Sequence, residues 1–190
     1  MTKTKKVITR FFTIADYDEE TAFLHEQHLQ GWKFKKVILP CFFIFEKSEK
    51  EDYIYQLEYV NKKQGEDYFT LYQDYGWEYC GSCVGWNYFR KPADQVHSAI
   101  DKEIFSDDSS KLKMISNISR TRLIPLVIIL CSLFINIFIQ QNRQSMVDHI
   151  LFIILLLLIL IYLVLIPSIW IKLRKKKKSW VINKSTLEVV

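Results

Sequence analysis

The chain has 190 residues, of which 49% are hydrophobic and 25% charged, and its formal net charge is +5. The charge is unevenly divided: residues 1–110 carry 14 Lys/Arg and 19 Asp/Glu, whereas residues 111–190 carry 12 Lys/Arg and 2 Asp/Glu. Residues 1–110 also hold 22 of the 28 aromatic residues. An aromatic-rich composition excludes a disordered N-terminal region. Its acidic balance argues against nucleic acid as a partner.

Residues 1–91 contain a repeated pattern. Gly31-Trp32 recurs as Gly76-Trp77, and Phe45-Glu46-Lys47 recurs as Phe89-Arg90-Lys91, at offsets of 45 and 44 positions. The first copy, about residues 7–47, is predicted to contain a strand over 7–12, a helix over 18–30, and strands over 32–38 and 41–47. A glycine after the last helical residue commonly adopts the left-handed conformation and ends the helix, which is the role expected of Gly31.

The second copy, about residues 53–91, follows the same order. It is predicted to contain a strand over 53–60, a helix over 66–75, and strands over 77–80 and 84–91 joined by a turn at Gly81-Ser82. We therefore expect an α+β cytoplasmic domain with a duplicated strand-helix-strand-strand order. Its six strands would be mainly antiparallel, with both helices on one face.

Two long apolar segments follow a polar linker over residues 92–122. Residues 123–139 and 150–171 carry no Lys, Arg, Asp or Glu, so helices over them would measure about 26 and 33 Å, close to the ~30 Å hydrocarbon core of a bilayer. They predict a transmembrane hairpin with helices over 123–141 and 150–171, followed by a basic tail over 172–190.

Positive charge flanks the outer ends of this hairpin. Four Lys/Arg lie within residues 111–122 and six within 172–178, whereas the connection over 140–149 holds only Arg143 and Asp148. The positive-inside rule therefore predicts a two-span cell-membrane protein with both termini in the cytoplasm. No apolar segment directly follows the basic residues 1–10, so we expect no signal peptide.

Three cysteines of the N-terminal part raise a chemical alternative. Cys80 and Cys83 form a CxxC pair, and Cys41 occupies a position near that of Cys83 in the repeat. Such a pair can serve as a redox dithiol or as part of a metal site. A tetrahedral zinc site needs a fourth ligand, and none is evident nearby. We therefore expect no cofactor, with a thiol or metal protein as an alternative.

The abundance of aromatic residues suggests a binding surface. Two helices on one face of a sheet would leave some aromatic side chains on the other face, in a cleft or against a partner. The candidates for this ligand or partner surface are Trp32, Tyr55, Trp77 and Trp86. Core filling is the competing interpretation.

The hairpin offers two further candidates. The cations Arg174, Lys175, Lys176, Lys177 and Lys178 are expected to anchor the topology and to contact anionic lipid headgroups at the membrane surface. Asn136 lies alone in the first apolar segment, where it can hydrogen-bond to the second helix or to a second copy of the chain. A homo-oligomer is therefore left open.

The motifs Gly31-Trp32, Phe45-Glu46-Lys47, Tyr53-Ile54-Tyr55 and Tyr75-Gly76-Trp77-Glu78-Tyr79 occur in this order, with Phe89-Arg90-Lys91 closing the set. They resemble a family of bacterial membrane proteins catalogued as a domain of unknown function, whose members are often encoded beside PadR-type repressors. The resemblance implies a regulatory or envelope context and brings no catalytic residues. The strand-helix-strand-strand order is also similar to that of GyrI-like effector-binding domains, which hold amphipathic ligands between their halves.

These features lead to one favoured expectation and two alternatives. The favoured one is a non-enzymatic, membrane-anchored sensor or adaptor whose aromatic-rich domain binds an amphipathic small molecule or a protein partner. The first alternative is a small accessory or immunity-type envelope protein that packs against a transporter. The second is the CxxC thiol or metal protein.

Overall fold

The computed structural model describes residues 4–60, 64–97, 108–139 and 146–187. The chain divides into two compact units, Met1–Met114 and Ile115–Val190. Much of the expected connection over 140–149, part of the linker over 92–122 and the last residues of the tail lie outside the described residues.

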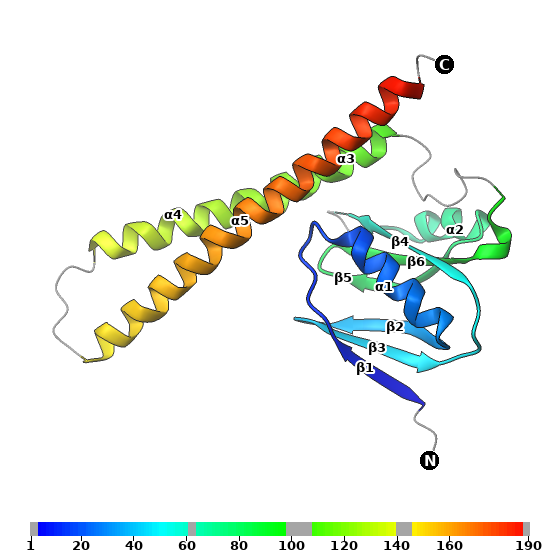
Figure 1. The fold of residues 1–190 in the computed structure, drawn as a ribbon, viewed down its shortest axis with the longest axis horizontal. Helices are drawn as coiled ribbons and strands as arrows, with labels where there is room; N and C mark the ends of the chain where they lie inside the picture. The colour runs from blue at the N-terminus through cyan, green and yellow to red at the C-terminus, as the bar shows by residue number, and fades with distance from the viewer. Residues whose placement is uncertain (1–3, 61–63, 98–107, 140–145, 188–190) are drawn as a thin grey trace. The chain divides into compact units, whose positions relative to one another are not determined.

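The first unit contains the strand-helix-strand-strand order twice (Figure 1). Its elements are β1 (Lys5–Thr9), α1 (Tyr17–Leu29), β2 (Trp32–Ile38), β3 (Phe42–Lys47), β4 (Tyr53–Tyr59), α2 (Glu66–Asp74), β5 (Glu78–Cys83), β6 (Trp86–Pro92) and the short helix η1 (Ala93–Gln95). The strands form two antiparallel three-stranded sheets, β1-β3-β2 (sheet A) and β4-β6-β5 (sheet B). The α+β class is confirmed.

Both helices of this unit end at the expected glycines. Gly31 and Gly76 have φ values of 84° and 81°. Their N–H groups donate to the carbonyl oxygens of His28 and Gln73 at 2.8 and 2.9 Å. A side chain is disfavoured at these φ values, so glycine allows the chain to leave each helix and enter the next strand at once.

The predicted turn at Gly81-Ser82 is wrong. The β5–β6 hairpin turns at Val84 and Gly85, whose φ values are 49° and 83°, as a two-residue hairpin turn of the primed type requires. Gly81 lies within β5, where the pairing with β6 shifts register between Tyr79 and Gly81. Valine rarely adopts positive φ, so residue types alone favoured the wrong pair. The CxxC motif therefore runs along a strand instead of around a turn.

The expectation that both helices cover one face is also wrong. Tyr88 of β6 donates a hydrogen bond to Glu20 of α1 at 2.7 Å, whereas the adjacent Phe89 packs on Tyr72 of α2 with ring centroids 4.7 Å apart. Successive residues of a strand point to opposite faces, so α1 and α2 lie on opposite sides of sheet B. The central strand β6 is consequently buried on both faces, since residues 86–91 are all buried, whereas β4 and β5 are partly accessible.

Helix α1 also covers sheet A (Figure 1). The ring of Phe23 contacts those of Phe43 and Phe45, with centroids 5.4 and 5.9 Å apart. The two sheets meet directly as well, because Phe34 of β2 packs on Tyr88 of β6 at 5.1 Å. The aromatic residues thus fill several interfaces instead of one, which accounts for their number in so small a domain.

The second unit consists of helices. Helix α3 (Asp108–Ile118) begins before the unit boundary and leads through a π-helical turn, η3 (Ser119–Leu123), into α4 (Ile124–Ile139), and α5 (Met146–Leu187) follows. Two helical stretches, Leu112–Ile137 and Val147–Ser179, are long and apolar enough to cross a membrane. Only 11% and 6% of their most apolar windows are buried, whereas the core helix of a soluble protein would be largely buried.

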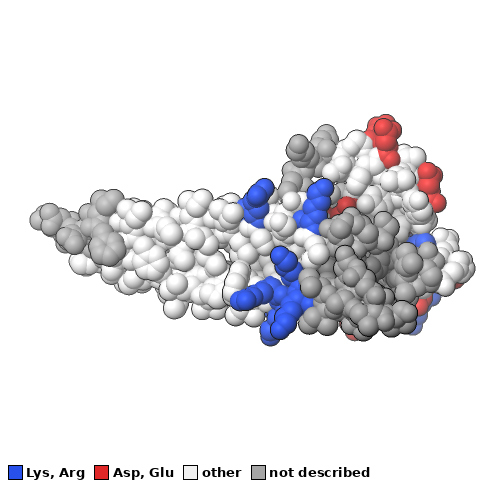
Figure 2. Space-filling view, turned by 90° about the horizontal axis from the view of Figure 1, so that it is seen from above, with Lys and Arg blue, Asp and Glu red and all other residues white. Residues whose placement is uncertain are grey.

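The described Lys and Arg residues of this unit gather at one end of the helix pair, whereas Asp148 lies in the first turn of α5. Helix α5 contacts both α4 and the π-helical turn that carries Arg120 and Arg122. Figure 2 shows Lys and Arg side chains clustered on one part of the paired helices, while the rest of the visible pair is uncharged. Helix α5 continues beyond the expected 150–171 through the basic run at 174–178.

Candidate functional site

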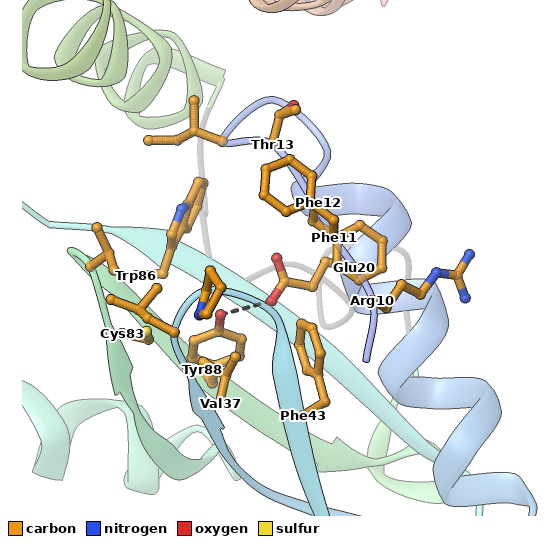
Figure 3. Close-up of a pocket in the computed structure, with 14 residues that line it drawn as sticks. Arg10, Phe11, Phe12, Thr13, Glu20, Val37, Phe43, Cys83, Trp86 and Tyr88 are labelled. Atoms are coloured by element: carbon orange, nitrogen blue, oxygen red, sulfur yellow. Dashed lines mark hydrogen bonds between the residues drawn. The ribbon is translucent and has the colours of Figure 1, made fainter. Parts of the chain in front are cut away.

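A cavity of about 410 Å³ opens within the first unit, and both copies of the repeat line it. Its wall consists of the segment Arg10, Phe11, Phe12, Thr13 and Ile14, with Glu20, Val37, Leu39, Pro40, Phe43, Cys83, Val84, Trp86 and Tyr88. Figure 3 shows that α1, the strands of sheet A and the β5–β6 hairpin approach it from different sides. We call this cavity the Glu20 pocket.

Glu20 is the acidic group of the pocket. Its side chain is buried, with 7% of the residue exposed, and it accepts the hydrogen bond from the Tyr88 hydroxyl (Figure 3). Burial raises the pKa of Glu20 to about 7; the Tyr88 hydrogen bond opposes this shift and the charge of Asp16 adds to it. The carboxyl group is therefore only partly ionised at neutral pH.

The arginine of the pocket does not neutralise Glu20. The Arg10 guanidinium lies over the rings of Phe12 and Phe23, 5.2 and 4.7 Å from their centroids. Figure 3 shows it directed away from the Glu20 carboxyl group. In residues 4–97, as far as the structure describes them, no Lys or Arg forms an ion pair with Glu20.

Helical spacing positions Glu20. Tyr17, Glu20 and Leu24 share the buried face of α1, whereas Asp18 and Glu19 are exposed. The acidic first turn therefore contains two solvated carboxylates, which suit the positive end of the helix dipole, and one that faces the interior. Just before the helix, Asp16 accepts hydrogen bonds from the Thr13 backbone N–H and hydroxyl at 2.9 and 2.6 Å, which orders the segment that forms one wall of the pocket.

Aromatic rings build the other walls. Trp86 packs against Tyr17 and Tyr59 with ring centroids 5.4 and 5.3 Å apart. On the opposite side, Phe12 and Phe43 meet edge to face at 5.7 Å. These packed rings give the pocket an apolar lining with a single buried carboxyl group, the composition typical of a site for a small molecule with an apolar body and a polar head.

A second polar cluster joins the two sheets away from the pocket. Arg90 of β6 is 4% exposed. It forms two hydrogen bonds with Glu78 and donates to the Phe34 carbonyl oxygen of β2 at 3.3 Å. Nearby, His28 Nδ1 lies 2.9 Å from the Tyr55 hydroxyl. Burial and, next, Arg90 lower the pKa of His28 to about 4, so this histidine is neutral at physiological pH and acts as a structural contact.

The three candidate cysteines are free thiols at three positions of the first unit. Cys83 lines the Glu20 pocket, and Cys41 precedes β3 and is half-buried. Burial raises the pKa of the Cys80 thiol to about 12, and burial also raises that of Cys83. Among the described residues, no group of three or more His, Cys, Asp or Glu side chains could hold a metal ion.

The four candidate aromatic residues lie in different places. Trp86 lines the pocket. Tyr55 and Trp77 are each 3% exposed and lie elsewhere in the core. Trp32 is half-buried, with Lys6 Nζ 5.5 Å from its ring centroid. Their role as a ligand or partner surface stays a prediction.

In the basic run of α5, the Arg174 guanidinium lies 4.9 Å from the ring centroid of Trp170. Lys175, Lys177 and Lys178 are exposed and Lys176 is half-buried. Contact of this run with lipid headgroups also stays a prediction.

Sequence reasoning missed Glu20, Tyr88, Phe12 and Phe43 as pocket residues. A signal for Glu20 existed, because it lies three residues after Tyr17 and four before Leu24 and so falls on the apolar face of the helix. Nothing local pairs it with Tyr88, which is 68 positions away.

Comparison with known proteins gives one match. The model of a family described as "Protein of unknown function (DUF2812)" matches residues 16–127. This range includes α1, all of sheet B and the start of α4. No curated protein and no solved structure matches the chain.

Proposed function

We propose that this chain, which belongs to the DUF2812 family, is a non-enzymatic, membrane-anchored binding protein that holds an amphipathic small molecule in the Glu20 pocket. One observation carries the proposal: a buried carboxyl group without a cationic partner among the described residues faces an apolar cavity of about 410 Å³. That volume lies in the range typical of small-molecule sites.

The chemistry of the pocket defines the ligand class. A carboxyl group at the wall of an apolar cavity is best stabilised by a group that donates a hydrogen bond or carries positive charge. The aromatic walls formed by Phe12, Phe43 and Trp86 suit an apolar or aromatic body. The ligand is therefore an amphipathic compound with an amine or a similar donor group.

The membrane hairpin supplies the anchor in this proposal. The exposed apolar helices α4 and α5 cross the bilayer, and the cations at 111–122 and 172–178 keep both termini in the cytoplasm. The first unit can then bind compounds dissolved in the cytoplasm or compounds that partition into the inner leaflet. The family resemblance adds a bacterial, PadR-linked regulatory context, in which ligand occupancy would be the signal.

The same geometry disfavours the thiol alternative. A nucleophilic or redox-active cysteine must be a thiolate, whereas burial holds the pKa of Cys80 near 12. Arg90 lowers that pKa only in part, and its guanidinium is already engaged by Glu78. Cys80 therefore serves as a half-buried packing residue of β5 in this proposal.

A matched probe series tests ligand binding. The purified full chain in detergent micelles would be titrated with 2-naphthylmethylamine, 2-naphthylmethanol and 2-naphthoate, and binding followed by energy transfer from tryptophan to the naphthyl group. We expect the amine to bind at least tenfold more tightly than the other two, because Glu20 pairs with its charge.

Two variants on the same helix make the test specific. Glu20→Gln should remove most of the preference for the amine, whereas Glu19→Gln, which changes an exposed neighbour, should leave it unchanged. Equal affinity for the three probes in the wild-type chain, or an amine preference that Glu20→Gln does not reduce, would contradict the proposed ligand class. Absence of binding by any probe would instead favour the accessory-protein alternative.

A further inference from the structure

Among the described residues of the first unit, no helix or strand packs on the outer face of sheet A. Helix α1 packs on the inner face, which carries Phe43 and Phe45 (Figure 1). The strand register defines three rows of residues across the outer face. These rows are Lys5-Glu46-Lys33, Val7-Ile44-Lys36 and Thr9-Phe42-Ile38.

Apolar side chains on this face are exposed. Val7 is 60% exposed, Ile38 47% and Phe42 39%. They are adjacent across the strands, because Phe42 pairs with Ile38 and Val7 pairs with Ile44. A contiguous apolar area on an exposed sheet face marks a contact surface more often than isolated exposed residues do.

Lysines lie to one side of this apolar area, in the rows that contain Glu46 and Ile44. The strands of sheet A contain six lysines and one acidic residue, Glu46, whereas α1 and α2 contain seven acidic residues and no Lys or Arg. Lys5, Lys33 and Lys36 lie in the outer-face rows, and Lys35 pairs with Glu46 of the same face. Lys6 and Lys47 alternate with these positions and fall on the other face, so four of the six lysines are on the outer face. We call Lys5, Lys33, Lys35 and Lys36 the face lysines.

The pKa of Glu46 reflects the positive charge of the lysines around it. Lys35 forms an ion pair with Glu46. The pKa of Glu46 is lowered, first by its hydrogen bond from Lys35 and further by the charges of Lys35, Lys5 and Lys33. The single carboxylate of Glu46 cannot balance the four ammonium groups of the face lysines. Lys33 Nζ also lies 3.9 Å from Glu78 Oε1, but the face still keeps a net positive charge.

We propose that the outer face of sheet A binds the anionic lipid surface of a membrane, with the face lysines on headgroup phosphates and Val7, Ile38 and Phe42 inserted between them. A headgroup layer can accommodate both kinds of side chain on one protein face. The lysine ammonium groups pair with the phosphates, and the apolar side chains enter between the headgroups. This contact is distinct from the basic run of α5 and from ligand binding in the Glu20 pocket.

Other occupants match the face less well. A second copy seated face to face would place lysine rows against lysine rows, which is unfavourable. Single-stranded nucleic acid is usually held by aromatic stacking platforms and arginines, whereas Phe42 is the one aromatic residue in the three rows and none of them contains arginine. Anionic lipid satisfies both the charge and the apolar surface.

Lysine footprinting of the full chain in nanodiscs tests the proposal. Discs of phosphatidylcholine alone would be compared with discs containing 30% phosphatidylglycerol, and acetylation rates at each lysine read by mass spectrometry. We expect the face lysines to react at least threefold more slowly in the anionic discs, because each lysine near such a surface favours docking about fivefold. Lys50, which is exposed in the segment after β3, should react equally in both.

A charge-reversal pair separates this contact from general attraction. Lys5→Glu/Lys36→Glu should abolish the protection of Lys33 and Lys35 in anionic discs, whereas Lys47→Glu/Lys50→Glu, with the same change in net charge, should retain it. Equal acetylation rates in the two disc types would overturn the proposal. Protection of the face lysines in detergent, together with a dimeric mass, would show instead that a second copy covers the face. Protection by an oligonucleotide but not by lipid would show that the face binds nucleic acid. Naphthyl titrations of the same variants measure ligand binding in the Glu20 pocket. Failure of the lipid-docking proposal is therefore distinguishable from failure of the ligand-binding proposal.

Discussion

At the scale of single residues, the proton on Glu20 links the pocket to the stability of the domain. The folded state holds this proton up to a pH of about 7, whereas an unfolded chain releases it near 4.3. Between these two pH values the folded state binds more protons than the unfolded state. The free energy of unfolding therefore falls as the pH rises from about 4.3 to about 7, and the contribution of Glu20 no longer changes at higher pH. The loss amounts to about 3 kcal/mol.

Glu20→Gln should remove this pH dependence. The variant cannot ionise, so we expect it to be more stable than the wild type by about 1–3 kcal/mol at pH 8 and to approach wild-type stability near pH 5. Urea unfolding of the full chain in micelles, followed by tryptophan fluorescence across this pH range, measures the difference. A difference that does not change with pH would show that Glu20 is ionised in the folded protein over the whole range.

Cys80 gives a second test at this scale. With its pKa held near 12 by burial, its thiolate fraction at pH 8 is about 10³-fold lower than that of an unperturbed cysteine. Iodoacetamide should therefore alkylate Cys80 in the folded chain about 10³-fold more slowly than in urea, as read by peptide mass spectrometry. Fast alkylation of folded protein would restore the thiol alternative.

At the scale of elements, β6 is the centre of the domain because both of its faces are buried. Phe89, which is 0% exposed, packs on the α2 side against Tyr72 and Tyr79. Phe89→Ala should lower the free energy of unfolding by about 3–5 kcal/mol through lost packing and the cavity left behind. Leu71→Ala, at a residue of α2 that is 54% exposed, should cost less than about 1 kcal/mol. Equal effects in urea unfolding would mean that α2 does not cover sheet B.

Local patterns explain which elements could be predicted. The stretch 32–38 was predicted as a strand and is one, since it follows a helix-ending glycine and is rich in β-forming residues. The β5–β6 turn could not be predicted, because Val84 adopts a conformation that its residue type disfavours. The two-sided burial of β6 could not be predicted either, since it depends on where α2 packs.

The Glu20 pocket lay beyond sequence reasoning for a related reason. Its two hydrogen-bonded residues belong to different copies of the repeat, and the walls come from both sheets. Composition suggested that aromatic residues would form a binding surface, but only Trp86 of the four candidates lines the cavity. Sequence periodicity assigns a side chain to one face of its element, whereas a pocket depends on which faces meet.

At the scale of the whole molecule, charge is sorted by segment. The formal charge of +5 combines an acidic N-terminal part with a strongly basic C-terminal part. Within the first unit it is sorted again, because the lysines concentrate on sheet A and the acidic residues on α1 and α2. We propose that both positive regions, the face lysines and the basic run of α5, bind the same anionic inner leaflet. Attraction of Lys and Arg to anionic lipid would then both orient the spans and dock the first unit on the membrane.

This sorting leads to a prediction about orientation. In a chain whose native cysteines are replaced by serine, an impermeant maleimide added to intact cells should label Ser145→Cys, in the connection between the spans, and should label Lys50→Cys only after the cells are permeabilised. Replacing Arg174 and Lys175–Lys178 by glutamine should produce a mixed or inverted orientation, because it removes the positive charge that we propose retains this end in the cytoplasm. Replacing the four lysines by arginine preserves the charge and should preserve the orientation. Labelling of Lys50→Cys in intact cells would show that the first unit is outside and that a different anionic surface must bind sheet A.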